Sequence, residues 1–225
     1  MNDETQARAK KRILVVDDHP LLRQGIGQLI NDQPDDAACG EAEDRTGAMT
    51  AAEAGKPDLA VVDITLKDQS GFELIKDFKA RFPGMAVLVL SMHEESLYAE
   101  RALRAGARGY IMKREASDKV LEGIRAILAG RVFVSDRIAA GILDKVSGHP
   151  PSSPRSPMSV LSDREVEVLL LIGKGHGSPQ IGRELHISVK TVEAHRANIK
   201  LKLGLQSSSE LLQFAIGWAG QIGEI

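Results

Sequence analysis

The sequence has little cysteine and no long hydrophobic run. Cys39 is the one cysteine among 225 residues, which excludes an internal disulfide and any multi-cysteine metal site. No uninterrupted apolar stretch approaches the roughly 18–20 residues that a membrane-spanning helix needs. The first residues, MNDETQARAKKR, are too polar for a signal peptide. We therefore expect a soluble, cytoplasmic protein that makes no membrane contact.

The chain also lacks an excess of charge of one sign. It has 29 lysine and arginine residues against 31 aspartate and glutamate residues, for a net charge of −2. The hydrophobic share of 43% and the charged share of 27% are typical of a globular protein and argue against disorder. Near-neutrality taken alone disfavours nucleic-acid binding, so the local distribution of charge has to be examined.

A proline-rich segment divides the sequence. Residues 149–157, HPPSSPRSP, hold four of the nine prolines, and such a run favours extended, solvated backbone. We expect one domain over residues 10–130 and a second over residues 158–225. Between them lies a linker, 131–157, in which Ile138, Ile142 and Val146 are spaced as on a helix covering 134–146.

Five strand-like runs alternate with helical patterns before the linker. The runs at 13–16, 59–62 and 86–90 are continuous and apolar, as in strands buried on both faces. Weaker runs occur at 37–39 and 109–112. Helical patterns lie near 20–32, 45–55, 71–82, 95–105 and 117–129. The alternation predicts a parallel sheet covered by helices, and the flavodoxin-like (βα)5 order is common at this length.

Polar residues follow the strands of this predicted sheet. Ligands of open parallel sheets gather at the carboxyl ends of the strands, where the sequence has Asp17, Asp18, Asp63, Ser91 and Lys113. Three converging carboxylates would repel one another without a cation, and an all-oxygen set with retained waters suits Mg²⁺. Asp63, on the middle strand, is then placed to attack phosphorus and form an acyl phosphate. The metal, Lys113 and Ser91 would neutralise the phosphoryl oxygens.

Four segments around these residues resemble the receiver domain of two-component response regulators. They are ILVVDDHPLLRQGI, LAVVDITLKDQSGFELI, VLVLSMHEES and RGYIMKREAS, and the resemblance covers roughly residues 12–130. It implies that Asp63 is the phosphoacceptor, that Asp17 and Asp18 bind the metal, and that Lys113 and Ser91 contact the phosphoryl group. It also implies Ser91 and Tyr110 as switch residues and the main-chain carbonyl of Thr65 as a metal ligand. Leu66-Lys67 departs from the family's usual Met-Pro.

Helical patterns alone follow the linker, and we expect an all-α domain of four short helices. Ser162 to Glu165 form a capping box, with Leu161 and Val166 as a hydrophobic staple. Ser178 before Pro179 is expected to cap the second helix, Ser188 the third, and one of the serines at 207–209 a fourth near 210–218. The third helix places Val192, His195, Ile199 and Leu203 on one buried face.

The third helix has a local excess of positive charge. From Lys190 to Lys202 there are four basic residues and one acidic residue. Two short helices joined by a tight turn, the second with a basic face, are typical of a helix-turn-helix. The segment from Leu161 to Leu205 resembles the LuxR/NarL-type DNA-binding domain, and this implies a recognition helix in the major groove. The candidate DNA contacts are Lys190, Thr191, Glu193, Ala194, Arg196, Ala197 and Lys200. Glu193 would accept from cytosine or orient a neighbouring side chain.

The two resemblances together imply a phosphorylation-controlled transcriptional regulator rather than an enzyme. Its expected partners are a sensor histidine kinase, double-stranded promoter DNA, RNA polymerase and, on phosphorylation, a second copy of the chain. An alternative is a constitutive DNA-binding regulator whose receiver serves only for protein interaction. A phosphoaspartyl hydrolase is disfavoured because such enzymes carry a second aspartate two residues after the nucleophile, where this chain has Thr65.

Overall fold

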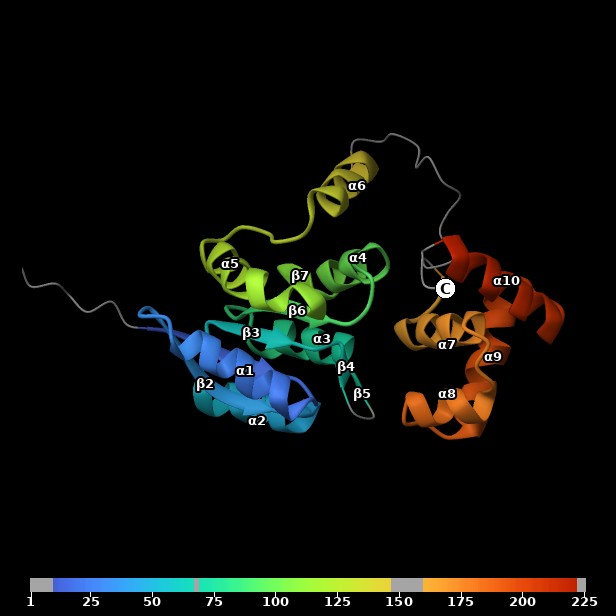
Figure 1. Cartoon of the computed structure of the whole chain (residues 1–225), viewed down its shortest axis with the longest axis horizontal. Helices are drawn as coiled ribbons and strands as arrows, with labels where there is room; N and C mark the ends of the chain where they lie inside the picture. The colour runs from blue at the N-terminus through green and yellow to red at the C-terminus, as the bar shows by residue number, and fades with distance from the viewer. Residues whose placement is uncertain (1–9, 67–68, 147–159, 222–225) are drawn as a thin grey trace, which may run out of the picture. The chain divides into compact units, whose positions relative to one another are not determined.

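The computed structural model describes residues 10–66, 69–146 and 160–221 (Figure 1). The chain divides into two compact units, Met1–Ile142 and Leu143–Ile225, which we call the N-terminal and C-terminal units. The proline-rich segment predicted at 149–157 lies outside the described residues, as does Lys67. Among the residues described, no helix is both long and apolar enough to cross a membrane.

The N-terminal unit is built on a parallel sheet of five strands. These are β1 (Lys11–Val16), β2 (Asp36–Ala42), β3 (Leu59–Val62), β6 (Ala86–Ser91) and β7 (Gly109–Met112). Their order is β2-β1-β3-β6-β7, and every neighbouring pair is parallel. The central strand β3 is buried along its whole length. The predicted flavodoxin-like fold is confirmed, because a continuous apolar run is stable only where helices cover both faces of its strand.

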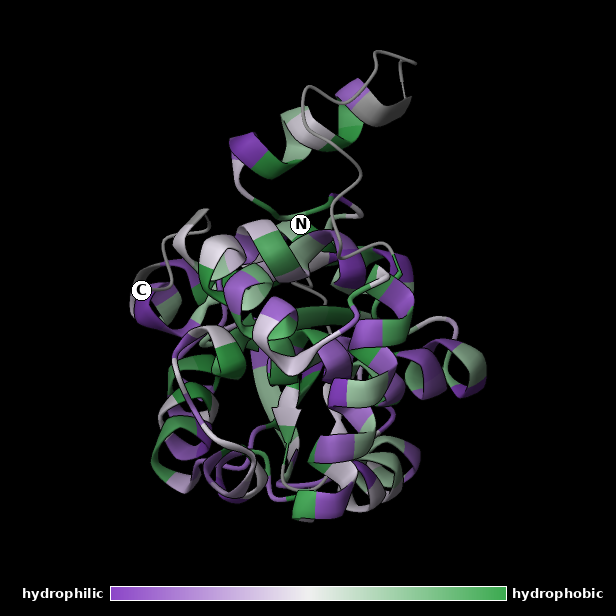
Figure 2. Ribbon diagram, turned by 90° about the vertical axis from the view of Figure 1, so that its right-hand side faces the viewer, coloured by the Kyte–Doolittle hydropathy of each residue, from purple (hydrophilic) through white to green (hydrophobic). Residues whose placement is uncertain are grey.

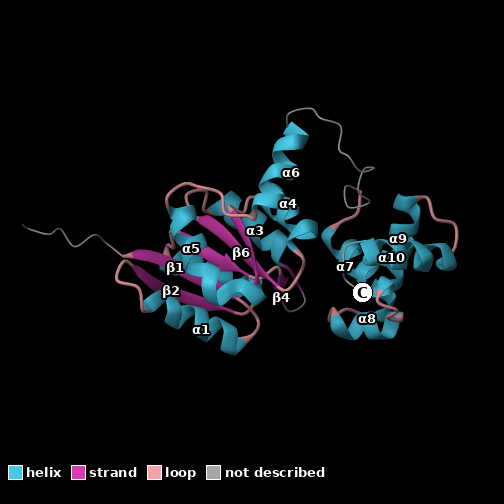
Figure 3. Ribbon diagram, turned by 45° about the horizontal axis from the view of Figure 1, so that its top comes forward, coloured by secondary structure: helices cyan, strands magenta, loops and turns pink. Residues whose placement is uncertain are grey.

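Helices cover both faces of the sheet (Figure 3). They are α1 (Pro20–Asn31), α2 (Arg45–Gly55), α3 (Gly71–Arg81), α4 (Glu95–Ala105) and α5 (Ala116–Leu128). One core cluster joins helices α1 and α5 to alternate residues of the strands. It includes Ile13 of β1, Val61 of β3 and Ile124 of α5. On the other side α3 packs between α2 and α4. The helices alternate green and purple along their length in Figure 2, as expected for elements with one apolar face.

A short hairpin interrupts the pattern directly after β3. Its strands β4 (Thr65–Leu66) and β5 (Gln69–Ser70) pair antiparallel, and the sequence pattern did not predict them. The chain then enters α3 at Gly71, where a Cβ would lie 2.4 Å from the carbonyl oxygen of Asp63 and from the Cα of Ile64. Only glycine allows this approach, so the start of α3 is packed directly against the backbone that carries Asp63.

The C-terminal unit contains the four expected helices. They are α7 (Asp163–Gly173), α8 (Ser178–Glu184), α9 (Val189–Leu203) and α10 (Ser208–Gln221). A further helix, α6 (Asp136–Val146), lies between the sheet and α7 in the sequence. The predicted capping box is present, because Ser162 Oγ accepts from the Glu165 amide and the Glu165 carboxylate accepts from the Ser162 amide. Ser188 caps α9, also as predicted.

The prediction that Ser178 caps the second helix is wrong. The helix α8 begins at Ser178, and Gly177 is its N-cap without a side-chain hydrogen bond. The Ser178 hydroxyl instead donates to the Glu193 carboxylate on α9. A cap hydroxyl must point back to its own helix, and here the neighbouring helix supplies a charged acceptor, which forms the stronger hydrogen bond.

Candidate functional site

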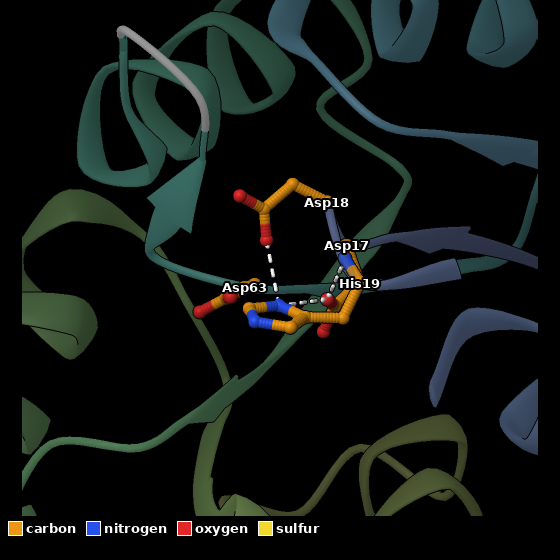
Figure 4. Close-up of side chains that lie close together, drawn as sticks. All are labelled: Asp17, Asp18, His19 and Asp63. Atoms are coloured by element: carbon orange, nitrogen blue, oxygen red, sulfur yellow. Dashed lines mark hydrogen bonds and ion pairs between the residues drawn. The ribbon is translucent and has the colours of Figure 1, made fainter. Parts of the chain in front are cut away.

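An acidic cluster lies at the carboxyl ends of β1 and β3. Asp17 and Asp18 follow β1 and Asp63 follows β3, and these strands are hydrogen-bonded neighbours. The ligand atoms of Asp17, Asp18, His19 and Asp63 all lie within 4.8 Å of one another, and the side chains face each other (Figure 4). Asp17 and Asp63 are buried. The structure therefore brings together the three carboxylates that the sequence pattern placed at this edge.

Lys113 completes this cluster from β7's side of the sheet. Its ammonium nitrogen lies 2.7 Å from Asp17 Oδ2 and 2.7 Å from Asp63 Oδ2, and its side chain is 5% exposed. Burial lowers the pKa of Lys113, but the charge of Asp63 and the hydrogen bonds to Asp17 and Asp63 outweigh burial and raise it above its ordinary value. Lys113 is therefore a permanent positive charge between the two carboxylates.

The carboxyl group of Asp63 is strongly affected by its burial. Burial raises its pKa from 3.8 to about 6, although Lys113 and the Thr65 amide act to lower it. That amide donates to Asp63 Oδ1 at 3.0 Å, while Oδ2 accepts from Lys113 at 2.7 Å. One positive side chain does not compensate the desolvation of this carboxylate, so an additional cation in the cluster would stabilise its charged form.

The oxygen-rich donor set of this cluster fits a hard divalent cation. Asp17, Asp18 and Asp63 offer carboxylate oxygens, which Mg²⁺ prefers. His19, whose side chain is 66% exposed, holds Asp18 at 2.7 Å through Nδ1, and its amide donates to Asp17 Oδ1 at 2.8 Å. Sequence reasoning did not assign His19 to the site. Its position directly after two aspartates was the signal that could have included it.

Ser91 is the last residue of β6, and Tyr110 is the second residue of the neighbouring strand β7. Ser91 is fully buried and its Oγ accepts from the His93 amide at 3.1 Å. The Tyr110 hydroxyl donates to the His93 carbonyl at 2.9 Å, and burial raises the tyrosine pKa well above its ordinary range. The loop at His93 therefore connects the hydroxyl of Ser91 to the ring of Tyr110.

The side chains of Thr65 and His93 contact each other. Thr65 Oγ1 lies 3.0 Å from His93 Nε2, and the His93 ring stacks on Tyr98 with 4.6 Å between centroids. The sequence pattern gave no reason to expect this contact, because it joins the β4–β5 hairpin to the loop after β6. The backbone amides of the same two residues donate to Asp63 Oδ1 and to Ser91 Oγ, so this contact joins the loops that carry those bonds.

The predicted buried face of α9 is present in part. Val192 and Ile199 are fully buried, whereas His195 and Leu203 are half-buried. The pKa of His195 is lowered by burial and by Arg164. Five of the candidate contacts are exposed and two, Arg196 and Lys200, are half-buried. The exposed ones are Lys190, Thr191, Glu193, Ala194 and Ala197. The small side chains of Ala194 and Ala197 leave the backbone of α9 accessible on this face.

Polar contacts hold α9 against the helices before it. Besides its bond with Ser178, the Glu193 carboxylate lies 3.9 Å from Arg196 Nε. Near the other end, Lys202 Nζ lies 2.6 Å from the buried Glu165 carboxylate of the α7 capping box. The contact between Ser178 and Glu193 joins α9 to α8, and the contact between Lys202 and Glu165 joins α9 to α7.

Comparison with known proteins agrees with the geometry of both units. The family described as "Response regulator receiver domain" matches residues 13–125, and "Bacterial regulatory proteins, luxR family" matches residues 159–215. The oxygen regulatory protein NreC of Staphylococcus haemolyticus is 33% identical over 209 residues, which cover 91% of this chain and 96% of that protein. NreC of Staphylococcus aureus strain JH9 matches to the same extent.

Two solved structures are similar over much of the chain. One is RcsB from Salmonella enterica serovar Typhimurium bound to promoter rprA in the presence of phosphomimetic BeF3⁻. It is 25% identical, covers 92% of this chain and 98% of its own, and has a TM-score of 0.59. The other is a LuxR-family two-component response regulator from Aurantimonas sp. SI85-9A1. It is 34% identical, covers 62% of this chain and 99% of its own, and has a TM-score of 0.56.

Proposed function

We propose a role for each unit from the premise that the chain belongs to the two-component response regulators that join a receiver domain to a LuxR-family DNA-binding domain. Members of this family are transcription factors controlled by phosphorylation. The proposal assigns residues 10–130 to the receiver, 131–157 to the linker and 158–225 to the DNA-binding domain. It locates the protein in the cytoplasm, where a sensor histidine kinase and the chromosome are both accessible.

Asp63 is the phosphoacceptor. The observation that carries this assignment is a buried carboxylate whose Oδ2 lies 2.7 Å from Lys113 and whose Oδ1 accepts from the Thr65 amide at 3.0 Å. An Asp63 oxygen attacks the phosphorus of a kinase phosphohistidine, the new P–O bond forms, and the bond from nitrogen to phosphorus breaks with its electron pair left on the imidazole. Asp63 is modified once per cycle, so no enzyme activity on a diffusing substrate is proposed.

Asp17, Asp18, Asp63 and the main-chain carbonyl of Thr65 would hold Mg²⁺. When bound, the ion supplies positive charge to the phosphoryl oxygens. Lys113 would add a second positive charge beside Asp63, and Ser91 Oγ would supply a hydrogen-bond donor. Lys113 is in place beside Asp63 before phosphorylation, whereas Ser91 has to turn when the charge of the phosphoryl group, near −2, appears.

Ser91 and Tyr110 form the switch. Ser91 Oγ now accepts from His93, and the Tyr110 hydroxyl donates to the carbonyl of the same residue. When Ser91 turns to the phosphoryl group it releases the His93 amide, and the loop and Tyr110 move together. This displaces the surface formed by α4 and β7 and favours a homodimer of the phosphorylated chain.

The C-terminal unit binds double-stranded promoter DNA through α9. Lys190, Arg196 and Lys200 contact phosphates. Thr191, Ala194 and Ala197 approach base edges, and Glu193 orients Arg196 while it is held by Ser178. A homodimer would read two half-sites about one helical turn apart, and the bound dimer would act on RNA polymerase. A constitutive regulator with an inert receiver is not favoured, because the acidic cluster and Lys113 are all in place.

Phosphorylation of the full chain with acetyl phosphate and Mg²⁺ tests the assignment of Asp63. The acyl phosphate is followed by the mobility of the chain on a phosphate-binding gel, and we expect Asp63→Asn to abolish it. Asp58→Asn, which neutralises an aspartate at the opposite end of the same strand, is the matched control and should be labelled like the wild type. Stable labelling of Asp63→Asn to the wild-type extent would refute the assignment.

A further inference from the structure

The chain that leaves α5 returns along the free edge of the sheet. The amide of Gly130 donates to Ile127 O at 2.9 Å and that of Arg131 to Ala126 O at 3.0 Å, and Gly130 has φ +82°. This is a Schellman end, in which glycine takes the left-handed conformation at no steric cost. It reverses the chain, so that residues 131–135 run beside β7 before α6 begins (Figure 1). We call residues 131–135 the strap.

The strap pairs with β7 as an added parallel strand of one residue. The Phe133 amide donates to Arg108 O at 2.9 Å, and the Phe133 carbonyl accepts from the Tyr110 amide at 2.9 Å. These bonds form a parallel bridge between Gly109 and Phe133. Since β7 is the last strand of the sheet, the strap covers an edge whose amides would otherwise face water.

Two glycines make room for the strap. A Cβ at Gly109 would lie 2.8 Å from the Phe133 carbonyl oxygen, and a Cβ at Gly123 on α5 would lie 3.1 Å from the Phe133 ring. The Phe133 ring packs against the core cluster shared by α1, α5 and the sheet. The strap is therefore packed against the sheet, α5 and the core, and does not only lie on the surface.

The far end of the strap is tied to α4. The Ser135 amide donates to Glu95 Oε1 at 2.8 Å, and Glu95 stands in the first turn of α4. Ser135 also starts α6, because its carbonyl accepts from the Ala139 amide at 3.0 Å. The strap is therefore hydrogen-bonded to β7 through Tyr110 and to α4 through Glu95. It also supplies the residue directly before α6, the helix that follows it in the sequence.

We propose that the strap couples the phosphorylation site to the linker helix: it is seated on β7 and Glu95 in the unphosphorylated chain and is released when Asp63 is phosphorylated. This rests on the proposed function, in which Tyr110 and the loop before α4 move with Ser91. The two anchors of the strap lie on different elements, β7 and α4. The strap has five residues, and only Val134 separates the residue that pairs with β7 from the residue that bonds Glu95. If β7 and α4 move relative to each other, so short a segment cannot keep both hydrogen-bonded contacts.

Hydrogen exchange of the full chain measures the release directly. Beryllofluoride with Mg²⁺ serves as the phosphoryl mimic, and its binding is verified by ¹⁹F NMR with Asp63→Asn as the non-binding variant. We expect deuterium uptake in peptides covering 131–136 to rise when beryllofluoride binds. Unchanged protection of these peptides in the beryllofluoride-bound chain would overturn the coupling. Failure of the wild type to bind beryllofluoride would instead overturn the proposed function, so the two failures are distinguishable.

Thermodynamic reciprocity provides a second test. If phosphorylation releases the strap, then a weakened strap must favour the phosphorylated form by the same factor. We expect Glu95→Ala and Phe133→Ala to tighten beryllofluoride binding by about fivefold or more, the lower end of ordinary coupling between sites. Glu73→Ala, which removes an equal charge from α3 where Glu73 pairs with Lys76, should leave the affinity unchanged.

Unchanged or weaker beryllofluoride binding by the strap variants would refute the proposal. The Glu95→Ala variant keeps the test available if Phe133→Ala does not fold, because Glu95 is a partly exposed residue outside the core. A strap with only a structural role would lower the stability of both variants and leave beryllofluoride affinity as it is in the wild type.

Discussion

Replacing Asp63 with asparagine should stabilise the protein in the absence of divalent metal. Asp63 is 2% exposed, and burial raises its pKa from 3.8 to about 6 in spite of Lys113. A carboxyl group with a raised pKa in the folded state binds its proton more tightly there than in the unfolded chain. The charged form therefore opposes folding, and asparagine, which has nearly the same shape, has no charge to desolvate.

The size and pH dependence of this effect follow from linkage. Between pH 3.8 and about 6 the folded protein keeps a proton that the unfolded chain releases, so stability falls as the pH rises. Above that range both states are ionised and the full difference is present. The difference between 3.8 and about 6, at 1.36 kcal/mol for each pKa unit, makes Asp63→Asn more stable by up to about 3 kcal/mol at pH 7. The gain should vanish toward pH 4, and it should shrink when Mg²⁺ is added, because the ion binds the wild type, which has one more carboxylate, more tightly than the variant.

Urea unfolding in EDTA at pH 7 and pH 4 measures this gain. The two tyrosines, Tyr98 and Tyr110, lie in the receiver, and Trp218 is the one tryptophan of the chain. Near-ultraviolet circular dichroism of the two tyrosines thus follows the receiver, while Trp218 fluorescence reports the C-terminal unit and should not change. Asp58→Asn is a control of opposite sign. Burial works to raise the Asp58 pKa, but the Arg12 amide and Lys11 hold it below its ordinary value, so this variant should be destabilised at pH 7. Loss of stability in Asp63→Asn at pH 7 would refute the reasoning.

Two further predictions concern the C-terminal unit. Arg196→Ala or Lys200→Ala should weaken binding to a random-sequence duplex and reduce the slope of log affinity against log salt by about 1. Lys76→Ala on α3 is the charge-matched control, and an unchanged slope would mean that neither residue meets a phosphate. Glu165→Ala should destabilise the unit by about 2 kcal/mol, because it removes the acceptor of Ser162 and Lys202 together. Burial acts to raise the Glu165 pKa, but Lys202 and Ser162 lower it below 4.5. The loss measured by Trp218 fluorescence should therefore be full at pH 7 and smaller below pH 4.5, whereas an equal loss at both would contradict this account.

Much of the fold and of the site follows from short-range pattern. The continuous apolar run at 59–62 coincides with β3, because a parallel strand buried on both faces has to be apolar throughout. The weaker run at 109–112 also coincides with a strand, β7. Asp17 and Asp63 could be placed at one edge because the carboxyl ends of parallel strands share an edge. The capping box at Ser162 was predictable because it is a contact between residues three positions apart.

Other features depend on which elements meet. The β4–β5 hairpin has two residues in each strand, too few for a periodicity to be recognised. Ser178 has the residue type of a cap, but the carboxylate of Glu193, fifteen positions away, decides where its hydroxyl points. The contact between Thr65 and His93 spans 28 positions, and nothing in either local sequence indicates it.

By itself the sequence determined the order of strands and helices, the chemistry of the acidic cluster and the polarity of α9, because each depends on residue type and on spacing within one element. The tertiary structure alone decided that Lys113 bridges Asp17 and Asp63, that Glu193 is held by Ser178, and that Phe133 is seated between Gly109 and Gly123. These are contacts between elements distant in sequence, and their geometry is set by how whole helices and strands pack. The distances between these side chains therefore cannot be predicted from the spacing of residues along the chain.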